Sequence, residues 1–172
     1  MQKFVRLVGA VALTGLGVWL WIVFFPSPEK AIRLRLKALA QTASFDRGDG
    51  MVAKAYSAQK AAGYFTTNSE VDVDLRGYQQ FNFNGRDEIL QAVLAGARTW
   101  RGFKVEFLDI NVTLEPGQQS AKANLTGKWS VPGDREFNAQ EFNFFLRKEN
   151  GQWLIYRVET VKTLSQILLR AA

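Results

Sequence analysis

The segment from residue 141 to residue 161, EFNFFLRKENGQWLIYRVETV, constrains the fold more than any other. Asn150 and Gly151 are neighbouring residues that tolerate positive φ, which a type I′ turn requires at both of its central positions. Apolar side chains recur on both sides of this pair. The segment therefore predicts a long β-hairpin with one hydrophobic face, and we expect that face to pack against a hydrophobic core.

The strands before this hairpin change the phase of their apolar side chains. In residues 103–114 the apolar positions shift by one residue, from Phe103, Val105 and Phe107 to Leu108, Ile110, Val112 and Leu114. A one-residue shift would turn the oily face outward unless a β-bulge absorbs it. Residues 137–146 show a similar shift, so the sequence predicts two bulges and a strongly curved sheet.

Three helices are predicted before and between the strands. The first begins at Ser27, where Ser can cap and Pro28 suits the first turn, and it runs to about Ala43. The second covers residues 51–62, and the third is expected to follow an Asn84 cap. The alternating apolar residues of 71–83 predict one strand between the second and third helices, with a bend at Gly77. The predicted class is α+β, with three helices packed in a strongly curved, mostly antiparallel sheet.

The composition excludes several kinds of chemistry. The 172 residues include no Cys and no His. Ser-His-Asp and Cys-His catalytic arrangements and most zinc sites are therefore excluded. We expect neither a cofactor nor a metal site.

The charge distribution does not favour nucleic acid as a partner. The net charge of +6 includes a single local basic cluster, formed by Lys30, Arg33, Arg35 and Lys37. Nucleic-acid-binding domains usually present a more concentrated basic stripe together with aromatic platforms. We interpret the cluster as a solvated helix face close to anionic lipid headgroups.

An uncharged run of nineteen residues begins at Leu7 and ends at Phe25. As a helix it would be about 28 Å long, close to the roughly 30 Å of a bilayer core. It is longer than a usual signal-peptide core, and Phe25-Pro26 replaces the small residues of a cleavage site. We predict a transmembrane anchor in residues 1–26, a single domain in residues 27–172, and an extracytoplasmic (periplasmic) location for that domain, although basic residues flank both ends of the run.

The order of elements resembles that of the nuclear-transport-factor-2-like superfamily, which includes SnoaL-like and ketosteroid-isomerase-like proteins. The resemblance covers about residues 28–162 and depends on AAGYFTTNSEVDV, FNGRDEI, ANLTGKWSVPG and NGQWLIYRVETV in that order. It implies a cystatin-like cone, in which a curved sheet wraps three helices around an apolar cavity. This superfold hosts many unrelated functions, so it does not give the function by itself.

Two sets of candidate site residues follow. Arg157 and Glu159 share one strand face, and Glu141 on the preceding strand could join them, as in the Asp-Arg-Asp-like arrangement of epoxide hydrolases with this fold. A cross-strand ion pair at the sheet surface is the competing interpretation. The expected ligand pocket contains five aromatic residues: Tyr56, Tyr64, Tyr78, Trp100 and Phe144.

The leading functional hypothesis is a membrane-anchored, non-catalytic module that binds a protein partner or a small apolar ligand. The alternative is a SnoaL-like isomerase, dehydratase or epoxide hydrolase acting on a hydrophobic small molecule. A homodimer is compatible with both, and membrane lipid is the expected partner of residues 7–25.

Overall fold

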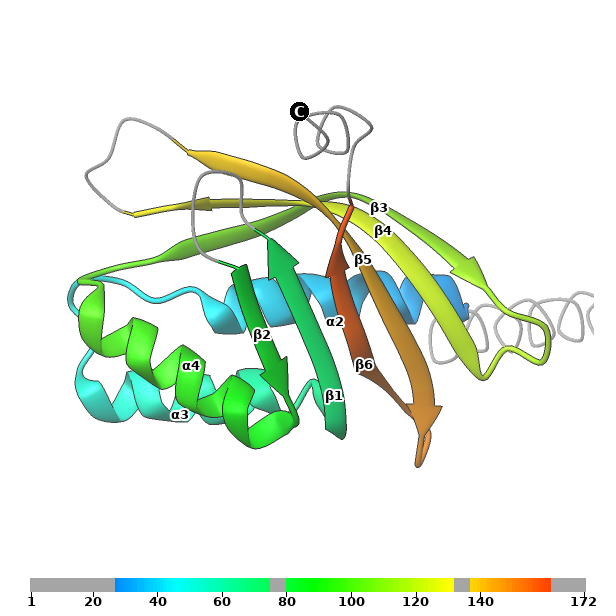
Figure 1. The fold of residues 1–172 in the computed structure, drawn as a ribbon, viewed down its shortest axis with the longest axis horizontal. Helices are drawn as coiled ribbons and strands as arrows, with labels where there is room; N and C mark the ends of the chain where they lie inside the picture. Colours follow the sequence, from blue (N-terminus) through cyan, green and yellow to red (C-terminus); the bar gives the residue numbers. More distant parts are fainter. Residues whose placement is uncertain (1–26, 75–79, 132–136, 162–172) are drawn as a thin grey trace, which may run out of the picture.

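The computed structural model describes residues 27–74, 80–131 and 137–161. Three helices are seen in these ranges: α2 (Pro28–Ala43), α3 (Met51–Ala62) and α4 (Arg86–Thr99). The six strands are β1 (Phe65–Asp74), β2 (Gln80–Asn84), β3 (Lys104–Leu114), β4 (Ser120–Ser130), β5 (Asn138–Glu149) and β6 (Gln152–Thr160). The predicted α+β class is confirmed (Figure 1).

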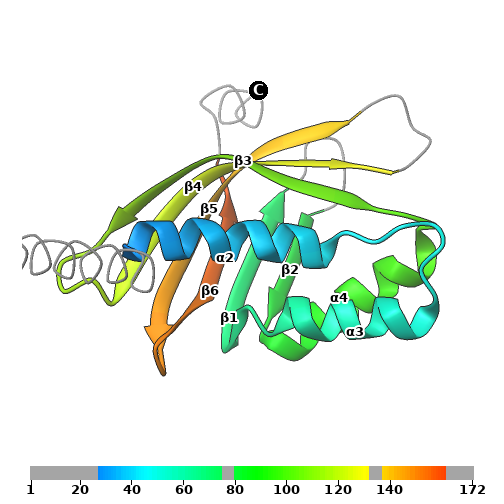
Figure 2. The same cartoon turned by 180° about the vertical axis from the view of Figure 1, so that it is seen from behind.

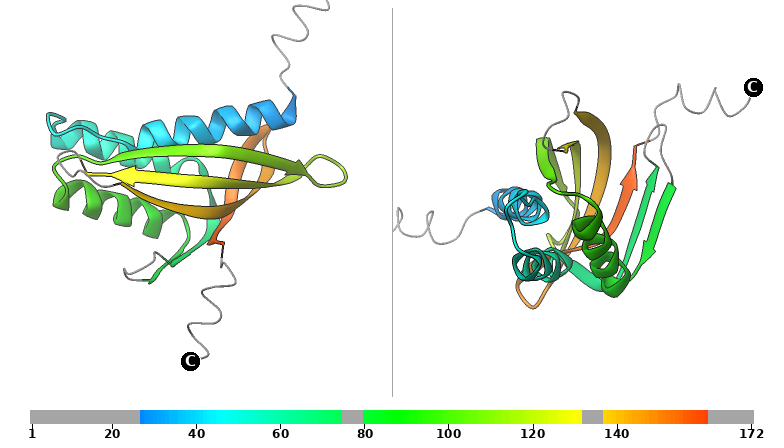
Figure 3. Two further views of the ribbon diagram at one scale, coloured as in Figure 1. Left: turned by 90° about the horizontal axis from the view of Figure 1, so that it is seen from above. Right: turned by 90° about the vertical axis from the view of Figure 1, so that its left-hand side faces the viewer.

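All six strands form one sheet in the order β2-β1-β6-β5-β4-β3. Only the β1–β6 pair is parallel, and the other pairs are antiparallel. The sheet curves around one side, and the three helices lie on that concave side (Figures 1 and 3). Figure 2 shows α2 crossing in front of the sheet, with α3 and α4 beside each other at the β1–β2 end.

Helix α2 begins and packs as its sequence predicts. The Ser27 hydroxyl accepts a hydrogen bond from the Lys30 backbone amide at 3.3 Å, and Pro28 occupies the first turn. The buried residues recur at helical spacing and are Ile32, Leu36, Leu39 and Ala40. This apolar stripe faces the sheet, mainly at β3.

Helix α4 does not begin as expected, because its cap is Gly85 rather than Asn84. Gly85 has φ +89°, a conformation that favours glycine at the sharp turn from β2 into the helix. Asn84 is the last residue of β2, and its backbone amide donates to the Glu88 carboxylate at 2.7 Å. The carboxylate three residues into the helix therefore satisfies a backbone amide at this helix end.

The other end of α4 is held by a buried lysine of α3. Lys54 is 8% exposed, and its ammonium donates to the carbonyls of Ala97 at 3.3 Å and Trp100 at 3.4 Å. The same ammonium lies 4.6 Å from the centre of the Phe45 ring. A cation suits the negative end of a helix, so this contact fixes α3 against α4.

The expected single strand over residues 71–83 is wrong. The structure has two antiparallel strands instead, and β1 already begins at Phe65. Val71 lies opposite Phe83, and Val73 lies opposite Phe81. Periodicity alone did not distinguish one bent strand from a hairpin, because both place these side chains on one face.

The first predicted bulge is confirmed and the second is misplaced. In β3 the register shifts between Leu108 and Asn111, and Asp109 there has φ +51°. The β4–β5 ladder is continuous from residue 138 to residue 147, so it contains no bulge. Phe137 and Ala139 are exposed, whereas Gln140 is buried. The strand therefore alternates regularly, and the apparent shift arises because apolar residues occupy outward positions and a polar residue occupies an inward one.

A bulge occurs instead in the terminal hairpin. Phe145 pairs with Arg157 and Leu146 pairs with Ile155, which leaves Tyr156 as the extra residue of β6. The predicted turn is confirmed, since Asn150 has φ +49° and Gly151 has φ +79°. The oily face of the hairpin belongs to the main hydrophobic core, through Phe142, Phe144, Leu146, Trp153, Ile155 and Val158.

The predicted membrane segment, residues 7–25, lies outside the described residues. Within the ranges that the structure does describe, no helix is both long enough and apolar enough to cross a bilayer.

Candidate ligand-binding cavity

A cavity of about 520 Å³ lies between the helices and the concave face of the sheet. All the described helices and strands contribute to its wall. The helices and the chain next to them supply Leu39, Ala43, Ala61, Ile89, Val93, Trp100 and Phe103. The strands and the chain next to them supply Phe65, Val71, Val73, Phe81, Val105, Phe107, Gly127, Trp129, Val131, Asn138, Phe142, Phe144 and Val158. Its size is within the range of about 300–1,000 Å³ that is usual for small-molecule sites.

Aromatic rings form much of this wall and contact each other. The Phe107 and Phe144 rings meet edge to face, with centroids 5.4 Å apart. The Trp100 ring stacks on Phe103 at 4.8 Å and is 44% exposed, so it forms part of the rim. Offset and edge-to-face ring pairs of this kind stabilise the wall beyond their buried area.

Gly127 gives the Phe142 ring its place in the wall. A Cβ atom at Gly127 would lie 2.7 Å from Cε2 of that ring, closer than nonbonded atoms approach. The inward positions of β4 before Gly127 are also small or aliphatic, namely Ala121, Ala123 and Leu125, whereas Trp129 after it is aromatic. Small residues on β4 therefore make room for the large rings of β5.

The described wall offers very little polar chemistry. Asn138 carries its only side-chain amide, and the indole N–H groups of Trp100 and Trp129 are the only other side-chain donors. None of the described lining residues is a carboxylic acid, lysine, arginine or tyrosine. The described wall thus suits an apolar molecule and contributes no general acid or base.

The structure brings two of the five predicted pocket residues to the cavity. Trp100 and Phe144 line it. Tyr56 is 68% exposed on α3, and Tyr64 is half-buried after the end of that helix. Neither of these two tyrosines is in the lining, and Tyr78 lies outside the described residues.

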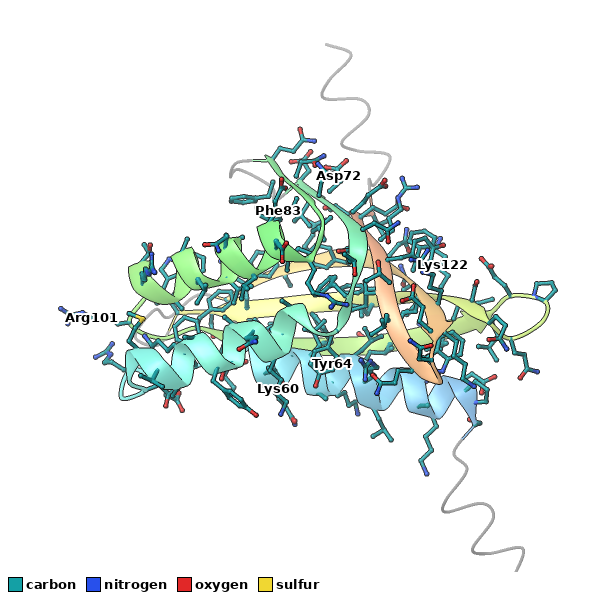
Figure 4. The ribbon with its side chains drawn as sticks, turned by 90° about the horizontal axis from the view of Figure 1, so that it is seen from below. Lys60, Tyr64, Asp72, Phe83, Arg101 and Lys122 are labelled. Carbon is teal, nitrogen blue, oxygen red and sulfur yellow. The ribbon has the colours of Figure 1, made fainter. Side chains whose placement is uncertain are left out.

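Tyr64 belongs to a separate contact with α2 (Figure 4). The Arg35 guanidinium lies 4.8 Å from the centre of its ring, a cation–π geometry. Burial lowers the pKa of Arg35, and the nearby Tyr64 acts in the opposite direction. Arg35 nevertheless stays charged, since an arginine pKa begins far above neutrality.

The three candidate catalytic residues lie on strands β5 and β6. Arg157 and Glu159 flank the cavity-lining Val158, so strand alternation places them on the opposite, outer face of the sheet. The Arg157 guanidinium and Glu159 carboxylate are 3.2 Å apart, and Asn143 donates to Glu159 at 3.3 Å. Glu141 is exposed and pairs with Thr126.

The structure therefore brings Arg157 and Glu159 together but does not add Glu141 to them. Their side chains are 52% and 32% exposed, which describes an ion pair at the sheet surface. Surface pairs of this kind are common and contribute little free energy.

Sequence reasoning missed most of the lining, especially Val105, Phe107 and Trp129. Their signal was present, because each occupies an inward position in a period-two pattern. That pattern gives the face of the strand, but it does not say which inward side chains border empty space and which touch other side chains.

No family model matches the chain, and no curated protein matches it in sequence. Solved structures match it in shape. A nuclear-transport-factor-2-like protein with a cystatin-like fold from Novosphingobium aromaticivorans superposes with a TM-score of 0.63 at 17% identity, covering 92% of this chain and 95% of that one. The chain therefore has the cystatin-like fold that these solved structures share.

Two further structures support this fold. A domain of unknown function from Nostoc punctiforme has a TM-score of 0.61 at 16% identity, over 85% of each chain. A scytalone dehydratase-like protein from N. aromaticivorans has a TM-score of 0.56 at 18% identity, over 78% of this chain and 83% of that one. At these identities the similarity establishes the shape of the chain and leaves its chemistry to its own residues.

Proposed function

We propose that this protein is a single-pass membrane protein whose cone-shaped domain binds a small apolar ligand without transforming it. The single observation that carries the proposal is the cavity of about 520 Å³. Its described wall is made almost entirely of aliphatic and aromatic side chains.

The nature of the wall supports binding of an uncharged, mainly apolar molecule. A charged group would lose its hydration in such a cavity without gaining a described partner of opposite charge, which is costly. An apolar molecule would bury its own surface against the wall at about 25 cal/mol per Å². Asn138 offers one hydrogen-bonding position for an alcohol or carbonyl group.

The uncharged run that begins at Leu7 and ends at Phe25 supports the membrane part of the proposal. It is followed almost directly by α2, which begins at Pro28. A short connection keeps the domain beside the bilayer, where apolar molecules are concentrated.

The test uses the full chain in phosphatidylcholine vesicles that contain a long-chain alcohol carrying a photoreactive diazirine. After irradiation, mass spectrometry of peptides should find the probe on cavity-lining segments such as residues 100–107. Residues 7–25 should also be modified, because the same probe is dissolved in the bilayer around the anchor.

A matched pair of variants on α4 makes the test specific. Val93 lines the cavity, so Val93→Trp should fill part of it and reduce labelling of residues 100–107. Ala95 is exposed on the same helix, so Ala95→Trp should leave that labelling unchanged. Equal labelling in both variants would refute ligand binding in the cavity, and unlabelled residues 7–25 would refute the anchor.

A further inference from the structure

The outward face of α2 combines exposed cations with an exposed leucine. Lys30, Arg33 and Lys37 are exposed on this helix, and Leu34 among them is 55% exposed. The ion pairs found within the described ranges involve none of these three cations. The opposite side of the helix is buried against the sheet, so this face points away from the core.

Helix α3 extends this surface on the same side of the sheet (Figures 2 and 3). Three of its apolar or aromatic residues are strongly exposed: Met51 at 54%, Val52 at 86% and Tyr56 at 68%. Lys60 is also exposed, and its side chain points away from the sheet (Figure 4). We call the exposed residues of α2 and α3 the outer helix face; they are Lys30, Arg33, Leu34, Lys37, Met51, Val52, Tyr56 and Lys60.

The two helices that make this face carry one acidic residue, Glu29 in the first turn of α2. Residues 30–43 and 51–62 contain none of the 16 acidic residues of the chain. The outer helix face therefore has a net positive charge even with Glu29 beside it, and aliphatic and aromatic side chains lie between its four cations.

We propose that the outer helix face lies on the surface of a bilayer that contains anionic lipid. This inference rests on the membrane anchor of the proposed function and deepens it. The N-terminal residues outside the described structure end at residue 26, just before α2 begins at Pro28, so the anchor would bring this helix to the headgroup region. The charge of the face complements anionic headgroups there.

The residue types on the face match both layers of a membrane surface. Lysine and arginine extend long apolar stems and keep their charges among the headgroups. Leu34, Val52 and Tyr56 supply apolar contact with the boundary between headgroups and acyl chains. Nucleic acid would use the cations but not the exposed aliphatic groups, and a second copy related by two-fold symmetry would bring like charges together.

The experiment takes advantage of the absence of cysteine from the chain. The full chain carrying Leu34→Cys, labelled with a nitroxide, is reconstituted in phosphatidylcholine vesicles with or without phosphatidylglycerol. Electron paramagnetic resonance then compares how accessible the label is to oxygen, which enters the bilayer, and to a water-soluble nickel complex, which does not.

The matched control is Leu108→Cys. Leu108 is a 43% exposed leucine on β3. Helix α2 packs against β3, and Leu108 alternates with the cavity-lining Phe107, so it lies on the outer face of the sheet, away from the helices. We expect the Leu34 label to show bilayer-type accessibility in anionic vesicles and the Leu108 label to stay aqueous in both kinds of vesicle.

A charge variant tests the electrostatic part. Each cation removed should lower the ratio of docked to undocked domain about 5-fold, so three should lower it roughly 100-fold. The test variant carries Lys30→Gln, Arg33→Gln and Lys37→Gln. The control variant has the same total charge change through exposed residues elsewhere: Lys104→Gln, Lys122→Gln and Lys148→Gln. The control should dock like the unaltered chain.

A Leu34 label that stays aqueous in anionic vesicles overturns the proposal. This result is expected if the face instead serves to bind an acidic protein partner. Spin–spin broadening of the label in mild detergent, without vesicles, also overturns it, since a second copy would then cover the face. A label at Val18→Cys reports insertion of the anchor separately. An inserted Val18 label with an aqueous Leu34 label would therefore refute the docking face and leave the anchor intact.

Discussion

Replacing Gly127 with alanine should destabilise the domain through a single contact. The added Cβ would lie 2.7 Å from Cε2 and 3.0 Å from Cδ2 of the Phe142 ring, so the ring has to shift. Overpacking of this kind costs about 1–3 kcal/mol. The reduced freedom of the unfolded chain offsets about 0.4–1 kcal/mol of that cost. We expect a net loss of about 1–2 kcal/mol.

Thermal unfolding of the full chain in mild detergent, followed by circular dichroism, measures this loss. At about 2–4 °C per kcal/mol for a chain of this size, Tm should fall by roughly 2–8 °C. The control Gly48→Ala should not lower Tm, because an added Cβ there meets nothing within 4 Å. The shifted ring should also enter the cavity, so labelling by the diazirine alcohol should fall.

A double variant decides whether the Phe142 ring is the cause. In Gly127→Ala with Phe142→Leu, the smaller side chain should remove the clash. The double variant should then be no less stable than Phe142→Leu alone. The effects of the two substitutions on the free energy of unfolding would thus be non-additive, as expected for residues in contact. If Gly127→Ala keeps the original Tm, or if the two losses simply add, the reasoning about this contact is refuted.

Three further changes test other parts of the fold by the same measurement of Tm. Lys54→Met should lower the free energy of unfolding by about 1.5–3 kcal/mol, because it removes charged hydrogen bonds to the end of α4. The exposed control Lys60→Met should lower it by less than about 0.5 kcal/mol. Equal losses in the two variants would contradict the capping role of Lys54. Gly151→Ala should cost about 1 kcal/mol, because the residue has φ +79° in the hairpin turn, and an unchanged Tm would contradict that turn conformation. Arg157→Ala should lower the free energy of unfolding by less than about 1 kcal/mol, since its ion pair with Glu159 is largely exposed. A larger loss would contradict the description of this pair as a surface ion pair.

Local signals in the sequence predicted most of the elements. Ser27 and Pro28 placed the start of α2, and the Asn150-Gly151 pair placed the turn of the terminal hairpin. These signals succeed because a cap or a turn depends on a few adjacent residues. The start of α4 was missed by one residue, because Asn84 and Gly85 are both acceptable caps and the turn from β2 selected glycine.

The candidate site was only partly predictable. Trp100 and Phe144 were expected at the pocket and line the cavity, whereas Tyr56 is on the outside of α3. An aromatic residue in a helix can face the core or the solvent, and the packing of α3 against its neighbours decides which. Arg157 and Glu159 lie on one strand face, and their exposed ion pair agrees with the competing interpretation of a pair at the sheet surface.

The sequence by itself determined the class of the fold, the positions of the helices, the hairpin turn and the bulge in β3. It also excluded catalysis by histidine or cysteine, because the chain has neither residue. Only the tertiary structure decided the pairing of β1 with β6, the bulge at Tyr156 and the residues that border the cavity. These features depend on contacts between residues far apart in the chain, and an empty volume arises only where packed helices and a curved sheet fail to meet.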